Sequence, residues 1–195
     1  MHIRKAAAAD LPAILEIYAG ARDFMRANGN PTQWKDYYPP AGMIVRDIEL
    51  GVSYVCVGDC ACAGAVESGD VNNGACAGAV EGGDVNKGAC DGEVLAVFYF
   101  NIERDPTYEK IAGAWLNDAA CGVVHRIAVA RGGNGVGAFC LGWCFEQCGN
   151  IKIDTHKDNR PMRALLEKLG YAYCGIIWVL DGTEERMAYQ LSNAV

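Results

Sequence analysis

Four closely spaced glycines give this sequence its clearest candidate for chemistry. The segment RGGNGVG, residues 131–137, follows the apolar run 123–130 and precedes a helical pattern. Glycine lets the backbone approach a ligand closely and adopt positive φ angles, and the free N–H groups at the start of a helix attract anions. The turn therefore predicts a site for a phosphate-bearing cofactor, and two unrelated folds use such a turn.

The first interpretation is a dinucleotide site of an NAD(P)-dependent oxidoreductase. Gly133-x-Gly135-x-x-Ala138 satisfies the dinucleotide fingerprint, and Asp154 closes the next strand about twenty residues on, where a ribose-binding carboxylate belongs. A dinucleotide fold needs two mononucleotide halves, however, and only about forty residues follow Asp154. The last two strands are expected to form a hairpin, which ends any parallel series. This interpretation stays as the alternative.

The second interpretation rests on a resemblance to the GNAT acetyltransferase superfamily that covers nearly all of the chain outside a repeat insertion. The residues that carry it are the strand end Ile127-Ala128-Val129, the turn 132–137 that follows, and Asn159 through Gly170-Tyr171 over a helix. The start of the chain, residues 3–22, resembles the first strand and helix of the family. Three elements in the right order are more specific than one glycine motif.

The resemblance implies acetyl-CoA as co-substrate, an N-acetyltransferase activity on a primary amine by direct attack, and no metal. Successive backbone N–H groups of the loop would hold the CoA pyrophosphate, and a backbone N–H near Ile127 would stabilise the oxyanion. The cofactor-binding residues that it implies are Ile127, Ala128, Val129, Arg131, Gly132, Gly133, Asn134, Gly135, Val136, Gly137, Ala138 and Asn159. For Asn159, a helix N-cap before Pro161 is an equally good and compatible role.

Two positions depart from the family pattern. Gly132 stands where the family has an arginine or glutamine anchor, and Arg131 lies one place earlier. Leu166 stands where many members have the tyrosine that protonates the leaving thiolate, so the general acid is left open, with Tyr171 and Tyr173 as substitutes. These departures keep a second alternative, a non-catalytic acyl-CoA-binding sensor.

His125 is the candidate catalytic base, because an alkyl ammonium must lose its proton before it can attack. Imidazole accepts protons near neutral pH, and the resemblance places this strand beside the thioester. The other interpretation is a histidine that hydrogen-bonds within the sheet. The resemblance also places the acceptor pocket at the loop that carries Trp34, Tyr37 and Tyr38, although these aromatic residues suit packing under a long loop equally well.

Other reactive side chains are assigned structural roles. His156 is expected in a loop. Cys140, Cys144 and Cys148 fall four apart and predict an apolar stripe on one helix face rather than a metal site. Cys174 keeps an acyl-carrying thiol open, although no recognisable motif surrounds it.

The elements that must position these residues read as a mixed α/β domain. Asp10 is expected to cap a helix that ends at Gly29, and a second helix is expected at roughly 42–50. Strands are expected at 52–57 and 93–102, followed by a β-α-β-α-β stretch and a closing hairpin strand. The resemblance implies a central, mostly antiparallel mixed sheet with helices on both faces. Residues 1–195 are expected to form a single domain.

A tandem repeat interrupts this pattern at about 60–90. Residues 62–75 and 76–89 match at twelve of fourteen positions, and without residues 61–90 the flanking strands read as a β-hairpin with an Asp-Gly turn. A duplication in a hairpin tip is the simplest interpretation, since surface loops accept insertions readily. Asp70-x-Asn72-x-Gly74 and its repeat faintly resemble a calcium loop but lack the closing glutamate.

Composition narrows the class of protein. The chain is 51% hydrophobic and 21% charged, as in ordinary globular proteins, and its net charge of −7 argues against a nucleic-acid partner. No signal-peptide pattern or membrane-length apolar run is found, so a cytoplasmic protein with reduced cysteines is expected. The acidic balance favours a cationic small-molecule or peptide amine as the acceptor, and a homodimer is one option for the assembly.

Overall fold

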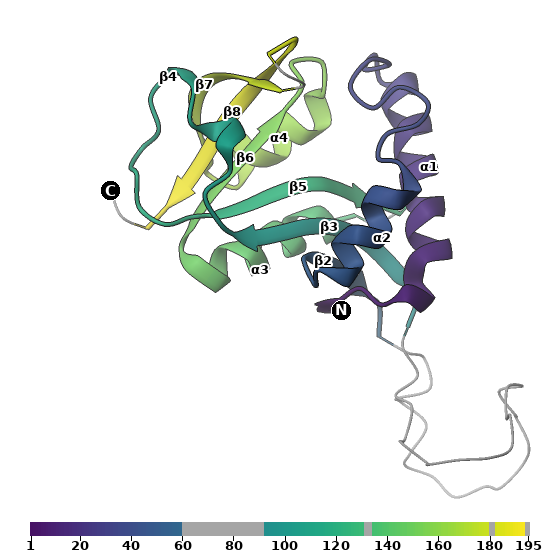
Figure 1. Cartoon of the computed structure of the whole chain (residues 1–195). Helices are drawn as coiled ribbons and strands as arrows, with labels where there is room; N and C mark the ends of the chain where they lie inside the picture. The colour runs from purple at the N-terminus through teal and green to yellow at the C-terminus, as the bar shows by residue number, and fades with distance from the viewer. Residues whose placement is uncertain (60–91, 131–133, 180–181, 194–195) are drawn as a thin grey trace, which may run out of the picture.

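The structure is a computed structural model of the chain, and it describes residues 1–59, 92–130, 134–179 and 182–193 (Figure 1). The repeat insertion therefore lies outside the described residues, as does the calcium interpretation of it. Arg131, Gly132 and Gly133 of the glycine turn also lie outside them.

Eight strands form one sheet in the order β1-β2-β3-β5-β6-β8-β7-β4. The strands are β1 (His2–Lys5), β2 (Ser53–Val57), β3 (Val94–Ile102), β4 (Ile111–Gly113), β5 (Gly122–Val129), β6 (Asn150–Thr155), β7 (Ala172–Val179) and β8 (Glu184–Ser192). All neighbouring strands pair antiparallel except β5 and β6, which are parallel. The expected mixed, mostly antiparallel sheet is confirmed. A single parallel pair is too little for a dinucleotide fold, so that interpretation is wrong.

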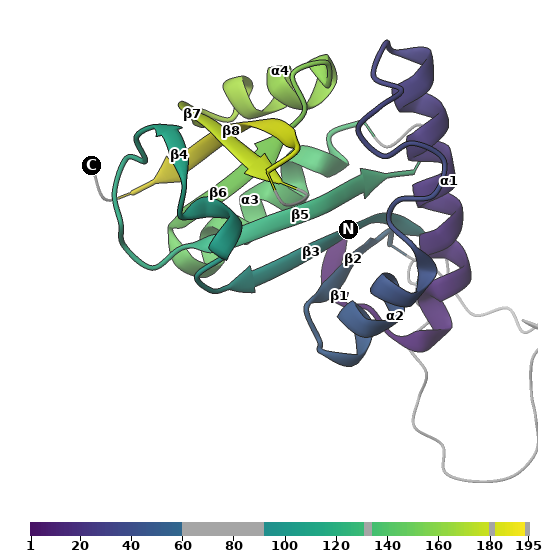
Figure 2. The same cartoon turned by 45° about the horizontal axis from the view of Figure 1, so that its top comes forward.

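The helices cover both faces of the sheet, as the resemblance implies (Figures 1 and 2). They are α1 (Leu11–Ala27), α2 (Ala41–Glu49), α3 (Val136–Cys148) and α4 (Arg160–Lys168), with short 3-10 turns η1 (Ala8–Asp10) and η3 (Pro106–Tyr108). Asp10 stands at the start of α1 as expected, but its carboxylate accepts from Ala7 N–H at 2.7 Å and from Arg4. Within the described part of the chain, no helix is both long enough and apolar enough to cross a bilayer.

The strands β2 and β3 form the hairpin that the sequence predicts on either side of the repeat. They pair antiparallel, and Gly58 N–H donates to the carbonyl of Glu93 at 2.9 Å. The hairpin pairing thus continues to Gly58 and Glu93, close to both ends of the insertion.

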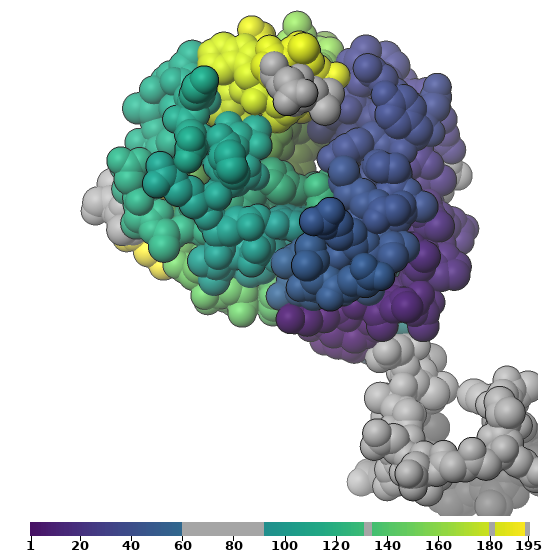
Figure 3. Space-filling model, in the orientation of Figure 1, coloured from purple at the N-terminus to yellow at the C-terminus, as the bar shows by residue number. Residues whose placement is uncertain are grey.

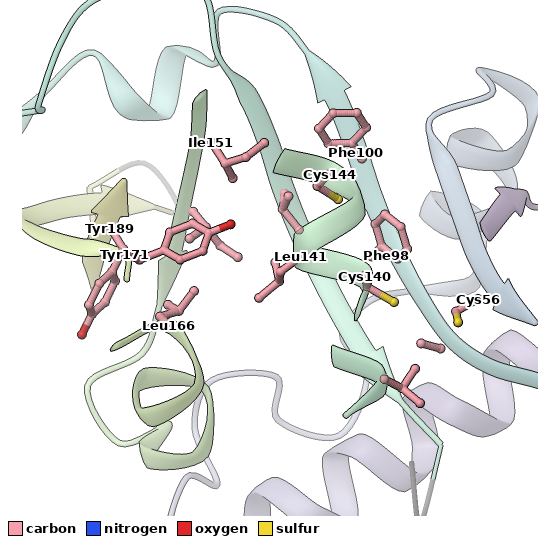
Figure 4. Packing of buried hydrophobic residues seen from close by; sticks show 14 residues of the cluster. Cys56, Phe98, Phe100, Cys140, Leu141, Cys144, Ile151, Leu166, Tyr171 and Tyr189 are labelled. Carbon is pink, nitrogen blue, oxygen red and sulfur yellow. The ribbon is translucent and has the colours of Figure 1, made fainter. Parts of the chain in front are cut away.

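One face of the sheet carries a continuous apolar cluster, and the other carries two separate ones. Under α3 and α4, Phe98, Cys140, Cys144 and Leu166 belong to a single buried cluster (Figure 4). The expected cysteine stripe is therefore confirmed as core packing. On the opposite face, one cluster lies under α1 and α2, and a smaller one lies under η3 and β4.

Candidate active site

A β-bulge in β5 shapes the space between these two clusters. Tyr99 pairs with His125 and Val97 with Ala128, so β5 has one residue more than β3 over this interval. Arg126 occupies the extra position with φ of 52°, in the left-handed region. Such bulges re-aim side chains. His125 and Arg126 consequently both face the cavity between the clusters.

The strands β5 and β6 part just beyond the bulge. Their parallel pairing ends at Val124 and Ile153, although β5 continues to Val129 and β6 to Thr155. The helices that follow the two strands, α3 and α4, begin at this end of the sheet. The pair thus opens toward the two helix N-termini, where unpaired backbone groups are available to a ligand.

A cavity of about 550 Å³ lies on the α1 and α2 side of this opening. Figure 3 shows the surface hollowed here, with the blue segment on one side and the teal and yellow segments on the other. Its wall combines aromatic, acidic and basic side chains. The aromatic residues are Trp34, Tyr37, Tyr38 and Tyr99; the acidic residues are Asp47, Glu103, Asp105, Asp154 and Glu184; and the basic residues are Lys35, Arg126 and Arg186, besides His125. The cavity brings together the predicted base and the three predicted acceptor-contact residues.

His125 is held between two carboxylates. Its Nε2 lies 2.8 Å from Asp105 Oδ2, and its Nδ1 lies 3.7 Å from Asp154 Oδ1. Asp105 is itself fixed, because its Oδ1 accepts from Thr107 N–H at 2.8 Å at the start of η3. Burial alone would raise the pKa of Asp105, but the hydrogen bonds from His125 and Thr107 outweigh it and lower the pKa to about 2. Asp105 is therefore ionised beside the ring.

The second carboxylate, Asp154, has donors of its own. Tyr108 Oη donates to its Oδ1 at 2.8 Å, and Arg186 Nε lies 3.9 Å from its Oδ2. Burial, with the nearby Asp154 charge, raises the pKa of Tyr108 well above its ordinary value. Tyr108 consequently remains a neutral donor. The dinucleotide interpretation predicted Asp154 at a ribose site. In the structure Asp154 instead lies beside His125.

Asn159 fulfils the N-cap prediction and also lines the cavity. Its Oδ1 accepts from Met162 N–H at 3.3 Å, and its Nδ2 donates to Gln33 Oε1 at 3.1 Å. Gln33 Oε1 also accepts from Asn30 Nδ2 at 2.6 Å. These amides tie the loop before α2 to the start of α4.

The aromatic candidates divide between packing and exposure. Trp34 is buried and packs against Tyr18 and Tyr38, with ring centroids 5.6 and 6.3 Å away. Tyr37 is 67% exposed at the cavity mouth. Trp34 therefore supports the wall, whereas Tyr37 presents its ring to anything that enters.

The described part of the glycine turn fits the expected backbone requirement. Gly135 has φ of 82° at the start of α3, and Asn134 beside it is exposed. A Cβ on Gly137 would lie 3.2 Å from Leu165 of α4, so glycine permits close packing there. Val136 is buried, and Ala138 follows it in the first turn of α3.

The strand residues predicted to flank the cofactor occupy different faces. Ile127 lines the cavity and, with Val129, also packs against the cluster under α3. Ala128 is buried in the cluster under α1. The bulge causes this division, because the extra residue changes which face each later side chain meets.

Leu166 at the usual acid position, the substitute acids Tyr171 and Tyr173, and Cys174 do not line the cavity. Leu166 and Tyr171 are buried in the cluster under α3 and α4, on the other face (Figure 4). Tyr173 is exposed, and Cys174 is buried with its Sγ directed at Ala172 O. Neither tyrosine therefore stands where it could protonate a group in the cavity. His156 lies in the β6–α4 loop, as expected, next to Asp158.

The partners of His125 were not predicted from the sequence. Asp105 and Tyr108 belong to the polar segment 103–109, whose run of charged residues directly after an apolar strand was the available signal. Tyr99 and Glu103 were missed as well, although both line the cavity. Among the described residues, no group of three or more His, Cys, Asp or Glu side chains is arranged to hold a metal ion.

Comparisons with known proteins agree with this architecture. No family model and no curated protein sequence matches the chain. Among solved structures, a GNAT-family acetyltransferase from Streptococcus agalactiae 2603 is 26% identical with a TM-score of 0.73, covering 100% of this chain and 96% of that one. A putative acetyltransferase from Staphylococcus aureus Mu50 is 17% identical with a TM-score of 0.59, covering 98% and 99%.

A phosphinothricin acetyltransferase of the GNAT superfamily from Sinorhizobium meliloti, solved in complex with AcCoA, is 16% identical with a TM-score of 0.55, covering 98% of this chain and 88% of that one. The similarity to the Streptococcus agalactiae protein spans the whole chain, and it agrees with the motifs in β5, α3 and α4 that the sequence displays. The chain therefore belongs to the GNAT superfamily of acetyltransferases and is an acyltransferase enzyme.

Proposed function

We propose that this protein transfers the acetyl group of acetyl-CoA to a primary amine, and that His125 takes the proton of the attacking amine. The observation that carries the proposal is the pair of Asp105 and His125, 2.8 Å apart, on the cavity wall where β5 and β6 part. A fixed carboxylate at one ring nitrogen leaves the other nitrogen to act as base, as in other catalytic histidines.

The residues present fit acetyl-CoA. Gly135 and Gly137 supply the backbone freedom and close packing that a phosphate-binding turn needs at the start of α3. Thr155 lies at the end of β6 in the cavity wall, and its hydroxyl is buried with no hydrogen-bond partner among the described residues. An unpaired buried hydroxyl costs about 1–3 kcal/mol, which a ligand amide or carbonyl could offset. Asn159 and Thr155 would hold the CoA arm, and the turn 131–137 its pyrophosphate.

The positions of the two ring nitrogens set their roles. With its proton on Nε2, neutral His125 donates to Asp105 and presents the lone pair of Nδ1. Acetyl-CoA would supply the thioester carbon, to which the amine nitrogen bonds as the carbon–sulfur bond breaks and CoA departs as its thiolate. The proton lost by the amine passes to Nδ1, and the imidazolium that results lies between the carboxylates of Asp105 and Asp154. Both carboxylates stabilise that charged form.

Direct attack by the amine is favoured over an acyl-cysteine route. No cysteine of the described residues lines the cavity, and burial raises the pKa of the Cys174 thiol, which disfavours the thiolate. The N–H of Ile127 is the candidate oxyanion donor, since pairing with β6 ends before it.

The test combines binding with turnover. Calorimetric titration should show binding of acetyl-CoA and none of NADH, and thiol release should follow addition of a primary amine. Binding of NADH alone, or acetyl-CoA binding without turnover across a broad amine panel, would contradict the proposal.

A further inference from the structure

We infer that the acceptor is a short diamine or polyamine, whose second ammonium group contacts Glu103 while its first amine lies at His125. The inference rests on the proposed function and names its substrate class. It follows from which charges of the cavity wall already have partners and which do not.

The arginines of the cavity are already paired with carboxylates of the chain. Arg126 Nη2 donates to Asp47 Oδ2 at 2.7 Å, and its guanidinium lies 4.9 Å from the centre of the Tyr99 ring. Arg186 Nη2 donates to Glu184 Oε2 at 2.7 Å. An acceptor carboxylate would have to compete with these ion pairs at short range.

The remaining cation of the wall is poorly placed to hold an acceptor carboxylate. Lys35 has a side chain that is 54% exposed, and its Nζ lies 3.9 Å from Glu184. An exposed lysine that already has a carboxylate nearby contributes little further binding energy. The cavity therefore offers amino acids and other carboxylate-bearing acceptors no buried cation without a partner among the described residues.

The carboxylates of the wall are less fully compensated. Asp105 and Asp154 flank His125 and serve the imidazolium formed when the amine loses its proton. Glu103 differs from both, because neither of its partners can become a cation: Tyr99 Oη donates to Oε1, and Asn101 Nδ2 donates to Oε2 at 2.9 Å. Among the described residues, Glu103 has no ion-pair partner. It is thus a fixed carboxylate that a cationic group of the acceptor can neutralise.

The spacing suits a short acceptor. Glu103 lies two residues before Asp105, so their Cα atoms are at most about 7 Å apart. The ring of Tyr99, which bridges the two sites, lies 5.5 Å from the His125 ring and donates to Glu103. Burial, reinforced by Glu103, raises the pKa of Tyr99 to about 12, so the phenol remains a neutral donor. His125 and Glu103 therefore both lie beside the same Tyr99 side chain, and we expect one small molecule to reach both.

A separate observation indicates that this cavity receives a ligand. Thr155 is 1% exposed and lines the same cavity, and its hydroxyl lacks a partner among the described residues. The carboxylates therefore do not stand alone as a feature of the surface. They surround a cavity whose wall contains a buried hydroxyl, that of Thr155, with no partner in the part of the chain that the structure describes.

The experiment compares three acceptors with the same four-carbon chain in the thiol-release assay: 1,4-diaminobutane, 1-aminobutane and 4-aminobutanoate. They place an ammonium, a methyl group or a carboxylate at the far end. The wild-type kcat/KM should be highest for the diamine, by about tenfold or more over either of the others, the worth of one charge-assisted hydrogen bond. A preference for 1-aminobutane or 4-aminobutanoate would overturn the inference while leaving acetyl transfer intact.

The matched variants are Glu103→Gln and Glu109→Gln. Glutamine keeps an acceptor for Tyr99 and removes the charge, whereas Glu109 lies outside this cavity and pairs with Arg104 at 3.3 Å. Glu103→Gln should raise KM for the diamine about tenfold and leave that for 1-aminobutane within twofold, while Glu109→Gln changes neither. Equal effects of Glu103→Gln on both amines would contradict the contact. If the wild type neither bound acetyl-CoA nor turned over any amine, the proposed function itself would be wrong.

Discussion

The two faces of the sheet differ in the charge state of their buried polar side chains. Under α3 and α4, burial raises the pKa of the Cys140 and Cys144 thiols and of the Tyr171 hydroxyl, which keeps all three neutral. On the opposite face, in the cavity between the two clusters, hydrogen bonds from His125 and Thr107 overcome burial and keep Asp105 ionised. Burial is present on both faces. The decisive difference is whether placed donors accompany it.

The strand β5 separates the two environments. Val124 and Ile127 pack in or against the cluster under α3 and also reach the cavity wall, whereas His125 and Arg126 lie outside that cluster and line the cavity. Simple alternation would not put two consecutive residues on one face. The bulge at Arg126 does so, and it thereby places the proposed base, His125, beside an arginine that is paired with Asp47.

The largest effect on turnover should come from the proposed base, His125, which lines the cavity. His125→Ala should lower kcat by about 10²- to 10⁴-fold, because the proton of the amine then lacks its acceptor. Steady-state thiol release measures this, and His156→Ala, outside the cavity, is the matched control. A His125→Ala enzyme within tenfold of the wild type would move the base elsewhere.

A large loss of stability, without loss of turnover, is expected from a substitution in the cluster under α3 and α4. Leu166→Ala should lower the free energy of unfolding by about 2–5 kcal/mol, because it leaves a cavity beside fully buried neighbours. The kcat of the folded fraction should stay within about twofold. Urea unfolding measures the change, with Leu50→Ala at a 63% exposed position as control. If Leu166→Ala abolished turnover in fully folded protein, the separation of the two faces would not hold.

The next effect concerns the residue that positions the base. Asp105→Asn should lower kcat about ten- to a hundredfold, since an amide holds the ring less firmly and no longer stabilises the imidazolium. If Asp105 acts through His125, the substitution should have little further effect in the His125→Ala background. A double-mutant cycle on kcat measures this. Additive losses would show that the two residues act independently.

The smallest effect is on acid stability. The folded pKa of Asp105 is about 2, below its ordinary value of 3.8, so its ionised form stabilises the fold above pH 4. That contribution is lost as the pH falls from about 4 toward 2. It is worth about 1 kcal/mol once partial solvent access is allowed for. Unfolding measured at pH 5 and pH 2.5 should show a smaller acid-induced loss for Asp105→Asn than for the wild type. An equal loss in both proteins would remove Asp105 as a source of acid sensitivity.

The apolar face was the easier one to predict from the sequence. The cysteine stripe of α3, the start of α4 at Asn159 and the hairpin around the repeat all follow from spacing and turn chemistry within a few residues. The positive φ angle of Gly135 at the start of α3 was likewise expected from its residue type. These features depend on residues close together in the sequence, so local patterns were enough to predict them.

The polar face was predicted only in part. The sequence indicated His125, but Asp105 and Asp154 lie 20 and 29 positions away along the chain and meet it only through the sheet and the η3 turn. No residue pattern announces a left-handed arginine in the middle of a strand. Tyr171 was a candidate acid by sequence proximity, yet it lies on the other face. Long-range pairing and the bulge decide these positions, and neither leaves a local signal.

The most direct test of the account is a structure of the enzyme with CoA and the acetylated form of the amine that it turns over fastest. The amide nitrogen of the product should lie about 2.7–3.2 Å from Nδ1 of His125, in the cavity between the two clusters. A product bound with its nitrogen beyond reach of His125, or on the face under α3 and α4, would contradict it.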